Sequence, residues 1–266
     1  MKYKLIVSDL DGTLLNNKTE ISERTLSAIG RYRAAGGLFS FATGRSEESA
    51  RPFVEKAGII EPVISFNGGK IYDYTDGGVL FETFLDAGAS KNAYKALRAL
   101  GKDVVVYLDK RRYIGEYTAV IDKYLEKLRH GVYFINNIDQ VFSDGIPLKK
   151  LLVIDPEQEG DLIVSSISPF FTCGFNCVKS DPQFYEILPP GTSKGEALAL
   201  LAAHFGVGLG ETIAIGDHLN DVSMIKTAGL GVAVANAERE TLEAANYITG
   251  SNDDDGVAQV IEKFAL

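Results

Sequence analysis

Near its N-terminus the chain reads KLIVSDLDGTLL over residues 4–15, where an apolar run leads directly into two aspartates. We expect residues 5–7 to form a buried strand, with Leu10 as a candidate continuation. Ligands of open α/β sheets bind beyond the carboxyl ends of the strands, so Asp9 and Asp11 are expected at a ligand site. Because residues two apart on a strand face the same side, both carboxylates are expected to face one ligand. The alternative is a strand that simply ends in an Asp-Gly turn.

Length and charge restrict the class of protein. The chain has 266 residues, enough for one large domain or two ordinary ones, and its formal net charge is −9. That charge argues against a broad surface for nucleic acid or anionic membrane. We see no signal peptide and no stretch long enough to span a bilayer, and we expect a cytoplasmic protein. The spacing of Cys173 and Cys177 is typical of neither a zinc nor a redox site, so we expect reduced, buried cysteines.

Strand-like and helix-like segments alternate up to residue 83 and again after the turn-forming sequence Pro-Pro-Gly at 189–191. Such alternation predicts an α/β fold in which crossover helices connect a Rossmann-like parallel sheet. Between these parts the strands cluster at both ends of the segment, which is typical of an α+β unit. We therefore expect a discontinuous core of residues 1–83 and 189–266 with an inserted α+β domain, 84–188. Within the insertion, helices are expected at 90–100 and 119–128, and strands at 104–108, 113–116, 151–154, 171–175 and 184–187.

A second strand with an acidic end lies near the C-terminus, where residues 213–221 read IAIGDHLND. Two strand ends of this kind in one parallel sheet converge on the same edge, although an acidic strand-to-helix loop is the simpler interpretation. Asp9, Asp11, Asp217 and Asp221 cannot all stay ionised close together without a counter-charge. Oxygen ligands with room for water and a phosphate oxygen favour Mg²⁺.

Two further residues suit a phosphate ligand. Thr43 follows a predicted strand, 38–42, and can donate its hydroxyl hydrogen to a phosphate. Lys194 begins a predicted helix, and its ammonium can neutralise a phosphate and a nearby aspartate, although an isolated lysine is typically a surface residue. We expect His218 to be an exposed loop residue rather than a ligand. The acidic run 253–255 is expected to be a solvated loop.

Four segments in this order, DLDGTLL, ATGR, TSKGEAL and GDHLNDVSM, resemble the motifs of the haloacid dehalogenase-like hydrolases. SFNGG and SNDDDGVA are similar to further segments of the Cof-type branch of that family. The resemblance covers the whole expected core. In position and size, the insertion resembles the large α/β cap domain of that branch.

The resemblance implies a role for each acidic residue. Asp9 matches the nucleophile that becomes an aspartyl-phosphate, and Asp11 matches the general acid that later serves as base. Asp217 matches a Mg²⁺ ligand, together with Asp9 and the backbone carbonyl of Asp11. Asp221 matches a residue that binds the metal or supports the metal site or Lys194.

The resemblance also implies a phosphate site and an activity. Its phosphate-binding residues match Thr43, Gly44, Lys194 and Asn220. Contacts to the organic part of a substrate are expected from the cap, with Arg45 and Asn67 as further candidates. The implied function is a Mg²⁺-dependent phosphatase for small phosphorylated metabolites, such as sugar phosphates or phosphorylated cofactors.

Two alternatives stay open on the same scaffold: a phosphotransferase or mutase, and a protein that binds phosphorylated metabolites without turnover. A nucleotide-binding dehydrogenase is disfavoured because no G-x-G-x-x-G follows the first strand. The sequence does not indicate an oligomeric state.

Overall fold

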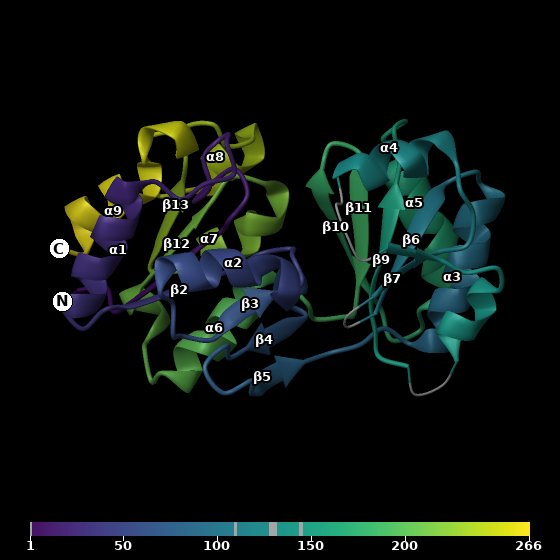
Figure 1. Ribbon diagram of the computed structural model, residues 1–266, viewed down its shortest axis with the longest axis horizontal. Coiled ribbons are helices and arrows are strands. Elements are labelled where there is room, and N and C mark those ends of the chain that lie inside the picture. The colour runs from purple at the N-terminus through teal and green to yellow at the C-terminus, as the bar shows by residue number, and fades with distance from the viewer. Residues whose placement is uncertain (1, 109–110, 128–131, 144–145) are drawn as a thin grey trace. The chain divides into compact units, whose positions relative to one another are not determined.

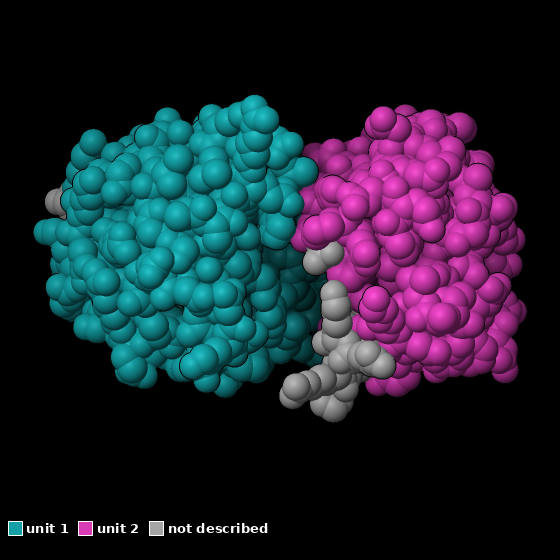
Figure 2. All heavy atoms as spheres, turned by 90° about the horizontal axis from the view of Figure 1, so that it is seen from above, with its two compact units in different colours: residues 1–82, 193–266 teal, residues 83–192 magenta. Residues whose placement is uncertain are grey.

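The computed structural model describes residues 2–108, 111–127, 132–143 and 146–266. The chain forms two compact units, of which the first contains Met1–Glu82 and Ser193–Leu266 and the second contains Thr83–Thr192. Figure 2 colours the atoms of each unit. No helix in the described part of the chain is both long and apolar enough to cross a membrane.

The first unit is built on a five-stranded parallel sheet with the strand order β14-β13-β12-β1-β2 (Figure 1). Its strands are β1 (Leu5–Ser8), β2 (Leu38–Phe41), β12 (Thr212–Gly216), β13 (Leu230–Ala233) and β14 (Tyr247–Ile248). The first strand of the chain is thus hydrogen-bonded to β12, which follows about 200 residues later, and this pairing brings the two acidic strand ends to one edge. The predicted α/β class with a parallel core is confirmed.

Helices cover both faces of this sheet. They are α1 (Glu23–Ala34), α2 (Glu47–Ala57), α6 (Lys194–His204), α7 (Val222–Thr227), α8 (Arg239–Ala244) and α9 (Gly256–Phe264). Ile6 of β1 belongs to the apolar core shared with α1 and α9, whereas Leu5 and Val7 belong to the core shared with α6 and α7. Alternate residues of a strand point to opposite faces, so a strand covered on both sides is apolar throughout.

A small antiparallel sheet extends the first unit beyond β2. It contains β3 (Val63–Ser65), β4 (Lys70–Tyr72) and β5 (Val79–Glu82), in that order. A single parallel bridge between Ala42 and Ile64 connects it to the end of β2. The short 3₁₀ turn Phe66–Gly68 joins β3 to β4 and lies next to the site described below.

The second unit contains a six-stranded sheet in the order β10-β11-β9-β6-β7-β8. Its strands are β6 (Asp103–Leu108), β7 (Arg112–Ile114), β8 (Val132–Phe134), β9 (Leu148–Ile154), β10 (Asn176–Asp181) and β11 (Phe184–Leu188). Helices α3 (Ala87–Ala99) and α5 (Gly160–Ile167) pack on one apolar face. Helix α4 (Ala119–Lys127) contacts the other face through Tyr124, whose hydroxyl is 2.8 Å from that of Tyr107. The last residue of the predicted helix 119–128 lies outside the described residues.

Several local expectations are wrong. The aromatic segment 171–175 is not a strand, because Gly174 adopts a φ of +85° that breaks extended structure, and the edge strand is Asn176–Asp181 instead. The sequence analysis also missed α5. Strand β1 ends at Ser8, so Leu10 does not continue it. Cys173 is exposed and Cys177 is half-buried, and both are free thiols.

Candidate active site

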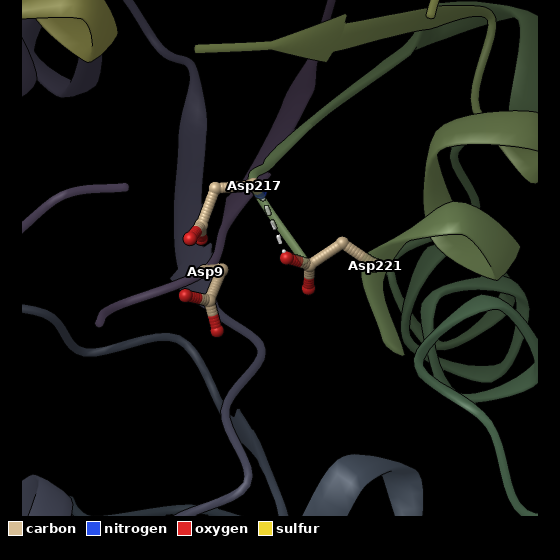
Figure 3. Close-up of side chains that lie close together, drawn as sticks. All are labelled: Asp9, Asp217 and Asp221. Carbon is tan, nitrogen blue, oxygen red and sulfur yellow. Dashed lines mark hydrogen bonds between the residues drawn. The ribbon is translucent and has the colours of Figure 1, made fainter. Parts of the chain in front are cut away.

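Three buried carboxylates meet at the carboxyl edge of the parallel sheet. Asp9 directly follows β1 and Asp217 directly follows β12, and the two strands are paired in register. One oxygen from each of Asp9, Asp217 and Asp221 lies within 4.8 Å of the others (Figure 3). We call these three residues the carboxylate cluster. The structure therefore brings together both acidic strand ends that the sequence analysis singled out.

The side chain of Asp221 closes the loop after β12. Its Oδ2 accepts hydrogen bonds from the backbone N–H groups of Asp217 at 2.9 Å and His218 at 3.0 Å. A Cβ on Gly216 would lie 2.3 Å from the Cβ of Asp221, so this strand end has no room for a side chain. Asp221 thus holds the backbone that carries Asp217.

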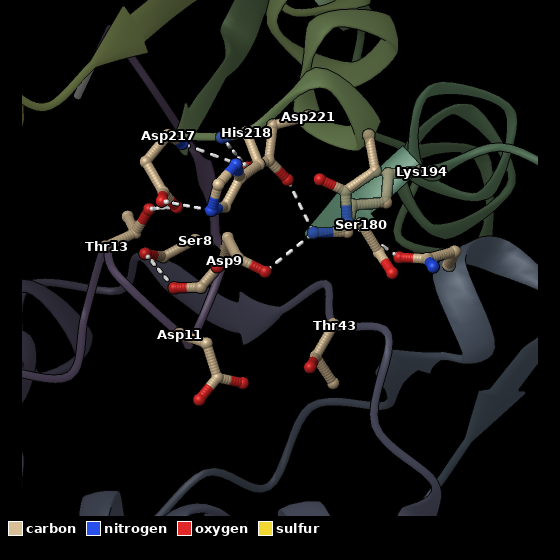
Figure 4. A network of polar contacts seen from close by, with 12 residues as sticks. Ser8, Asp9, Asp11, Thr13, Thr43, Ser180, Lys194, Asp217, His218 and Asp221 are labelled. Atoms are coloured by element: carbon tan, nitrogen blue, oxygen red, sulfur yellow. Dashed lines mark hydrogen bonds and ion pairs between the residues drawn. The ribbon is translucent and has the colours of Figure 1, made fainter. Parts of the chain in front are cut away.

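Lys194 supplies the positive charge of the cluster (Figure 4). Its Nζ lies 2.6 Å from Asp9 Oδ1 and 2.5 Å from Asp221 Oδ1, and its side chain is fully buried. The residue begins α6, where Ser193 Oγ caps the helix by accepting the N–H of Glu196. Burial lowers the pKa of Lys194, but Asp221 and Asp9 raise it more, so the ammonium stays charged.

The cluster carries more negative than positive charge. Burial raises the pKa of the Asp9 carboxyl well above its usual value, and Lys194 only partly opposes that rise. Burial also raises the pKa of Asp217 to about 6, and the Asp221 charge is the next cause. Three ionised carboxylates and one ammonium leave two negative charges uncompensated, which is the charge of one divalent cation. The donor set is all oxygen, as Mg²⁺ prefers, so the residues present fit that ion.

The turn after Asp9 is shaped around Asp217. Thr13 Oγ1 donates a hydrogen bond to Asp217 Oδ1 at 2.6 Å. Gly12 has a φ of +80°, and a Cβ there would lie 2.4 Å from Asp217 Oδ2. A residue with a side chain is disfavoured twice at this position, by its backbone conformation and by the contact. The sequence analysis did not assign a role to Thr13, although the residue lies within the first motif.

We predict that Gly12→Ala lowers catalytic turnover by at least about tenfold, because the new methyl group displaces the Asp217 carboxylate, and misplaced catalytic groups are costly. Gly36→Ala is the matched control, since Gly36 has a φ of +91° but a Cβ there would meet no atom within 4 Å. Both variants share the left-handed backbone penalty of about 1–2 kcal/mol. Equal kinetic losses in the two variants, measured with a phosphoester and Mg²⁺, would show that crowding at Asp217 is unimportant.

Asp11 is not part of the carboxylate cluster. Its side chain is 54% exposed, and both of its oxygens accept hydrogen bonds from Arg45, from Nε at 2.7 Å and Nη2 at 2.6 Å. Strand alternation does not set the directions of Asp9 and Asp11, because β1 ends at Ser8, before either residue. That both carboxylates face one ligand stays a prediction. Arg45, considered from the sequence as a contact for the organic part of a substrate, is the partner of Asp11 in this structure, and its contact with a substrate stays a prediction.

The remaining phosphate-site candidates, Thr43, Gly44 and Asn220, lie on two loops, and hydrogen bonds of the specificity candidate Asn67 connect them. Thr43 is buried at the end of β2, and its carbonyl accepts the N–H of Asn67 at 3.0 Å. Asn67 Oδ1 accepts from Asn220 Nδ2 at 3.0 Å. A Cβ on Gly44 would lie 3.1 Å from Asn67 Nδ2, so these loops are closely packed. Asn67 thereby joins the loop after β2 to the loop after β12.

The turn Phe66–Gly68 is strained and lies against the residue before Lys194. Phe66 and Asn67 have φ values of +52° and +54°, which residues with side chains rarely adopt. A Cβ on Gly68 would lie 2.2 Å from the carbonyl oxygen of Ser193. Backbone strain of this kind persists where the surrounding structure imposes it, often at functional sites.

The sequence analysis missed a set of contacts that hold the first loop from behind. Asn236 Nδ2 donates to the carbonyl of Gly12 at 2.8 Å, and Asn236 Oδ1 accepts the N–H of Asn252 at 2.9 Å. The acidic run 253–255, expected to be a solvated loop, also takes part, because Asp253 accepts the N–H of Asn17 at 2.9 Å. From the sequence, only the similarity of SNDDDGVA to a segment of the Cof-type branch indicated a functional role for residues 251–258.

His218 also differs from its expected exposed position. Its side chain is partly buried, with Nδ1 at 3.1 Å from Glu238 Oε1 and Nε2 at 3.6 Å from Asp217 Oδ2. It therefore borders the cluster.

Comparison with known proteins places the chain in a family. A profile of the haloacid dehalogenase-like hydrolases matches residues 6–261. The chain is 34% identical to YxeH of Bacillus subtilis (strain 168) over 99% of each chain. It is 31% identical to the 5-amino-6-(5-phospho-D-ribitylamino)uracil phosphatase YwtE of the same organism, over 98% of this chain and 97% of YwtE. A solved haloacid dehalogenase-like hydrolase from Bacteroides thetaiotaomicron is 31% identical, with a TM-score of 0.85 over 98% of this chain and 99% of that one.

A parallel sheet with a buried cluster of carboxylates and a lysine at its carboxyl edge defines an α/β protein with a site suited to a charged ligand. The chain belongs to the haloacid dehalogenase-like hydrolases, and it is an enzyme of their phosphatase type.

Proposed function

We propose that the protein is a Mg²⁺-dependent phosphatase that hydrolyses small phosphorylated metabolites, such as sugar phosphates or phosphorylated cofactors, through an aspartyl-phosphate. The observation that carries the proposal is the contact of Lys194 with Asp9 and Asp221 beside Asp217. A nucleophilic carboxylate, a fixed ammonium and space for one divalent cation are what phosphoryl transfer requires, because its catalysis is mainly positioning and charge neutralisation.

In the first step an Asp9 carboxylate oxygen forms a bond to phosphorus, and the bond from phosphorus to the ester oxygen breaks. Asp11 donates a proton to the departing oxygen, so that the product is a neutral alcohol. Lys194 holds Asp9 Oδ1, which orients the other oxygen, Oδ2, for attack. Thr43 and Gly44 contribute hydrogen-bond donors to the phosphoryl oxygens, with Asn220 as a further candidate.

In the second step a water oxygen forms a bond to the phosphorus of the aspartyl-phosphate while Asp11 accepts the water proton. The bond from Asp9 to phosphorus breaks, and inorganic phosphate leaves. Both steps use the same groups, and dividing hydrolysis into two displacements is the usual advantage of covalent catalysis.

Asp9, Asp217 and the backbone carbonyl of Asp11 are the residues that would hold Mg²⁺. When bound, the ion supplies charge neutralisation at the phosphoryl oxygens. Both oxygens of Asp221 already accept hydrogen bonds, from Lys194 and from two backbone N–H groups. We therefore assign Asp221 to the support of Lys194 and of the loop carrying Asp217, rather than to direct metal binding.

We predict that the purified protein releases inorganic phosphate from members of a phosphorylated-metabolite library, and that EDTA lowers the rate at least about 100-fold until Mg²⁺ is restored. Mg²⁺ should also raise the melting temperature, because it binds only the folded cluster. A screen of the library with and without Mg²⁺ makes the measurement.

Phosphorus NMR of the reaction mixtures distinguishes hydrolysis from transfer. Free phosphate as the product supports a phosphatase, whereas a new phosphoester signal at constant total ester would identify a phosphotransferase or mutase. Rates that are equal in EDTA and in Mg²⁺ would contradict the metal site.

A further inference from the structure

The ion pair between Arg45 and Asp11 occupies the group that the proposed reaction needs. Asp11 must place a carboxylate oxygen at the ester oxygen of the substrate, yet Arg45 Nε and Nη2 engage both of its oxygens at 2.7 Å and 2.6 Å. A planar guanidinium that matches both carboxylate oxygens makes a well-oriented pair. In this arrangement the guanidinium engages both oxygens of Asp11, so loss of either hydrogen bond would free that oxygen to turn toward the ester oxygen.

Arg45 is held in place by contacts that do not involve Asp11. Its backbone N–H donates to Thr43 Oγ1 at 3.1 Å, and its backbone carbonyl accepts the N–H of Phe66 at 3.0 Å. Its guanidinium carbon lies 4.8 Å from the centre of the Phe53 ring, and Nη1 lies 3.5 Å from the carbonyl of Ser49. The arginine would therefore stay near the site if Asp11 turned away.

The ion pair is also open to water. The side chains of Arg45 and Asp11 are 26% and 54% exposed, so solvent screens their attraction and can replace either partner. A phosphate group carries more charge than one carboxylate and accepts hydrogen bonds from arginine in the same forked geometry. A bound phosphoester is thus a stronger partner for Arg45 than Asp11 is.

We propose that Arg45 is a substrate-operated latch: it holds Asp11 in the free protein and passes to an oxyanion of the phosphorylated substrate on binding, which releases Asp11 toward the ester oxygen. This inference rests on the proposed function, because Asp11 needs release only if it serves as acid and base. Arg45 would thus have two roles: it positions Asp11 in the free protein and binds the substrate in the complex.

The kinetic test uses Arg45→Ala with p-nitrophenyl phosphate and Mg²⁺. The variant loses a charged contact to the substrate but keeps Asp11 free, so KM should rise at least about tenfold while kcat falls less than about threefold. A tenfold or larger fall in kcat with an unchanged KM would overturn the latch. That result would mean that Arg45 holds Asp11 in its reacting position.

Two further variants separate the latch from a general effect. Arg51→Ala is the matched control, since Arg51 lies on α2 over the Tyr74 ring and pairs with Glu55 at 3.8 Å. It should change neither KM nor kcat. In Arg45→Lys one ammonium can contact the substrate, so KM should recover toward the wild-type value. A Lys variant with the same KM as the Ala variant would argue against a contact between residue 45 and the substrate.

A spectroscopic test follows Arg45 directly in the wild-type protein with Mg²⁺. The Nε–H resonance of Arg45 should be protected from exchange in the free protein and unprotected in Asp11→Ala. Saturating orthovanadate, a phosphate mimic, should shift it. An unshifted Nε–H signal with clear shifts at the Thr43 and Gly44 amides would overturn the latch and leave the proposed phosphate site intact. If vanadate moved none of these signals, the phosphate site itself would be refuted, and the latch with it.

Discussion

Asp9→Asn is expected to lower phosphate release by at least about four orders of magnitude, as the loss of a catalytic nucleophile does in other enzymes. The amide has nearly the shape of the carboxylate, and its Oδ1 can still accept a hydrogen bond from Lys194, so the fold should persist. It cannot form the acyl phosphate. Initial rates on freshly purified protein, with the best substrate of the library and Mg²⁺, make the measurement.

The same substitution should not destabilise the metal-free protein. Burial raises the pKa of Asp9, which means that the folded state disfavours its charge, and the nearby carboxylates add to that cost. Replacing it with a neutral amide removes one of the uncompensated charges. We therefore expect a melting temperature in EDTA at or above the wild-type value, together with a smaller increase on addition of Mg²⁺.

Asp139→Asn is a suitable control, because Asp139 is a half-buried aspartate of the second unit, 3.0 Å from Lys91. It should retain wild-type kinetics. Substantial activity in Asp9→Asn with bound Mg²⁺ would refute the nucleophile assignment. Loss of folding in EDTA would instead refute the account of charge repulsion in the cluster.

The parts of the fold that the sequence predicted best are those governed by periodicity. Alternation of strands and helices indicated a parallel sheet, and strands covered on both faces contain unbroken apolar runs, as β1 does at 5–7 and β12 at 213–215. The carboxyl ends of parallel strands share one edge, so Asp9 and Asp217 could be expected together although 208 positions separate them. The prediction of a strand at 171–175 was wrong because aromatic residues favour a strand there, whereas Gly174 has a positive φ.

Side-chain partners were less predictable than strand positions. The pairing of Asp11 with Arg45 depends on how the loop after β2 turns, and that turn depends on Thr43 accepting the N–H of Arg45. No periodicity encodes such a contact. Asn236, which follows β13, likewise contacts Gly12, which follows β1, although β12 separates these two strands in the sheet. Sequence patterns located the strand ends, but tertiary contacts between loops decided which charged groups meet.

The burial of Lys194 leads to the second large prediction, since an isolated lysine is typically exposed. Lys194→Met keeps an unbranched side chain but leaves Asp9 and Asp221 buried without their cation. Removing one partner of a buried ion pair typically costs about 3–5 kcal/mol. We expect a loss of that size in the free energy of unfolding, measured by urea denaturation in EDTA, and a loss of phosphate release of at least about 100-fold.

The charge balance of the cluster determines how this loss responds to metal. Without Lys194 the three carboxylates would carry more uncompensated charge, so Mg²⁺ should recover more stability in the variant than in the wild-type protein. Lys226→Met, at an exposed position on the neighbouring helix α7, should change neither stability nor phosphate release.

If Lys194→Met were as stable as the wild-type protein in EDTA, the ammonium would not be what allows Asp9 and Asp221 to be buried together. In that case the carboxylates would have to be protonated in the free protein, and Asp9 would become a nucleophile only after a cation had displaced its proton.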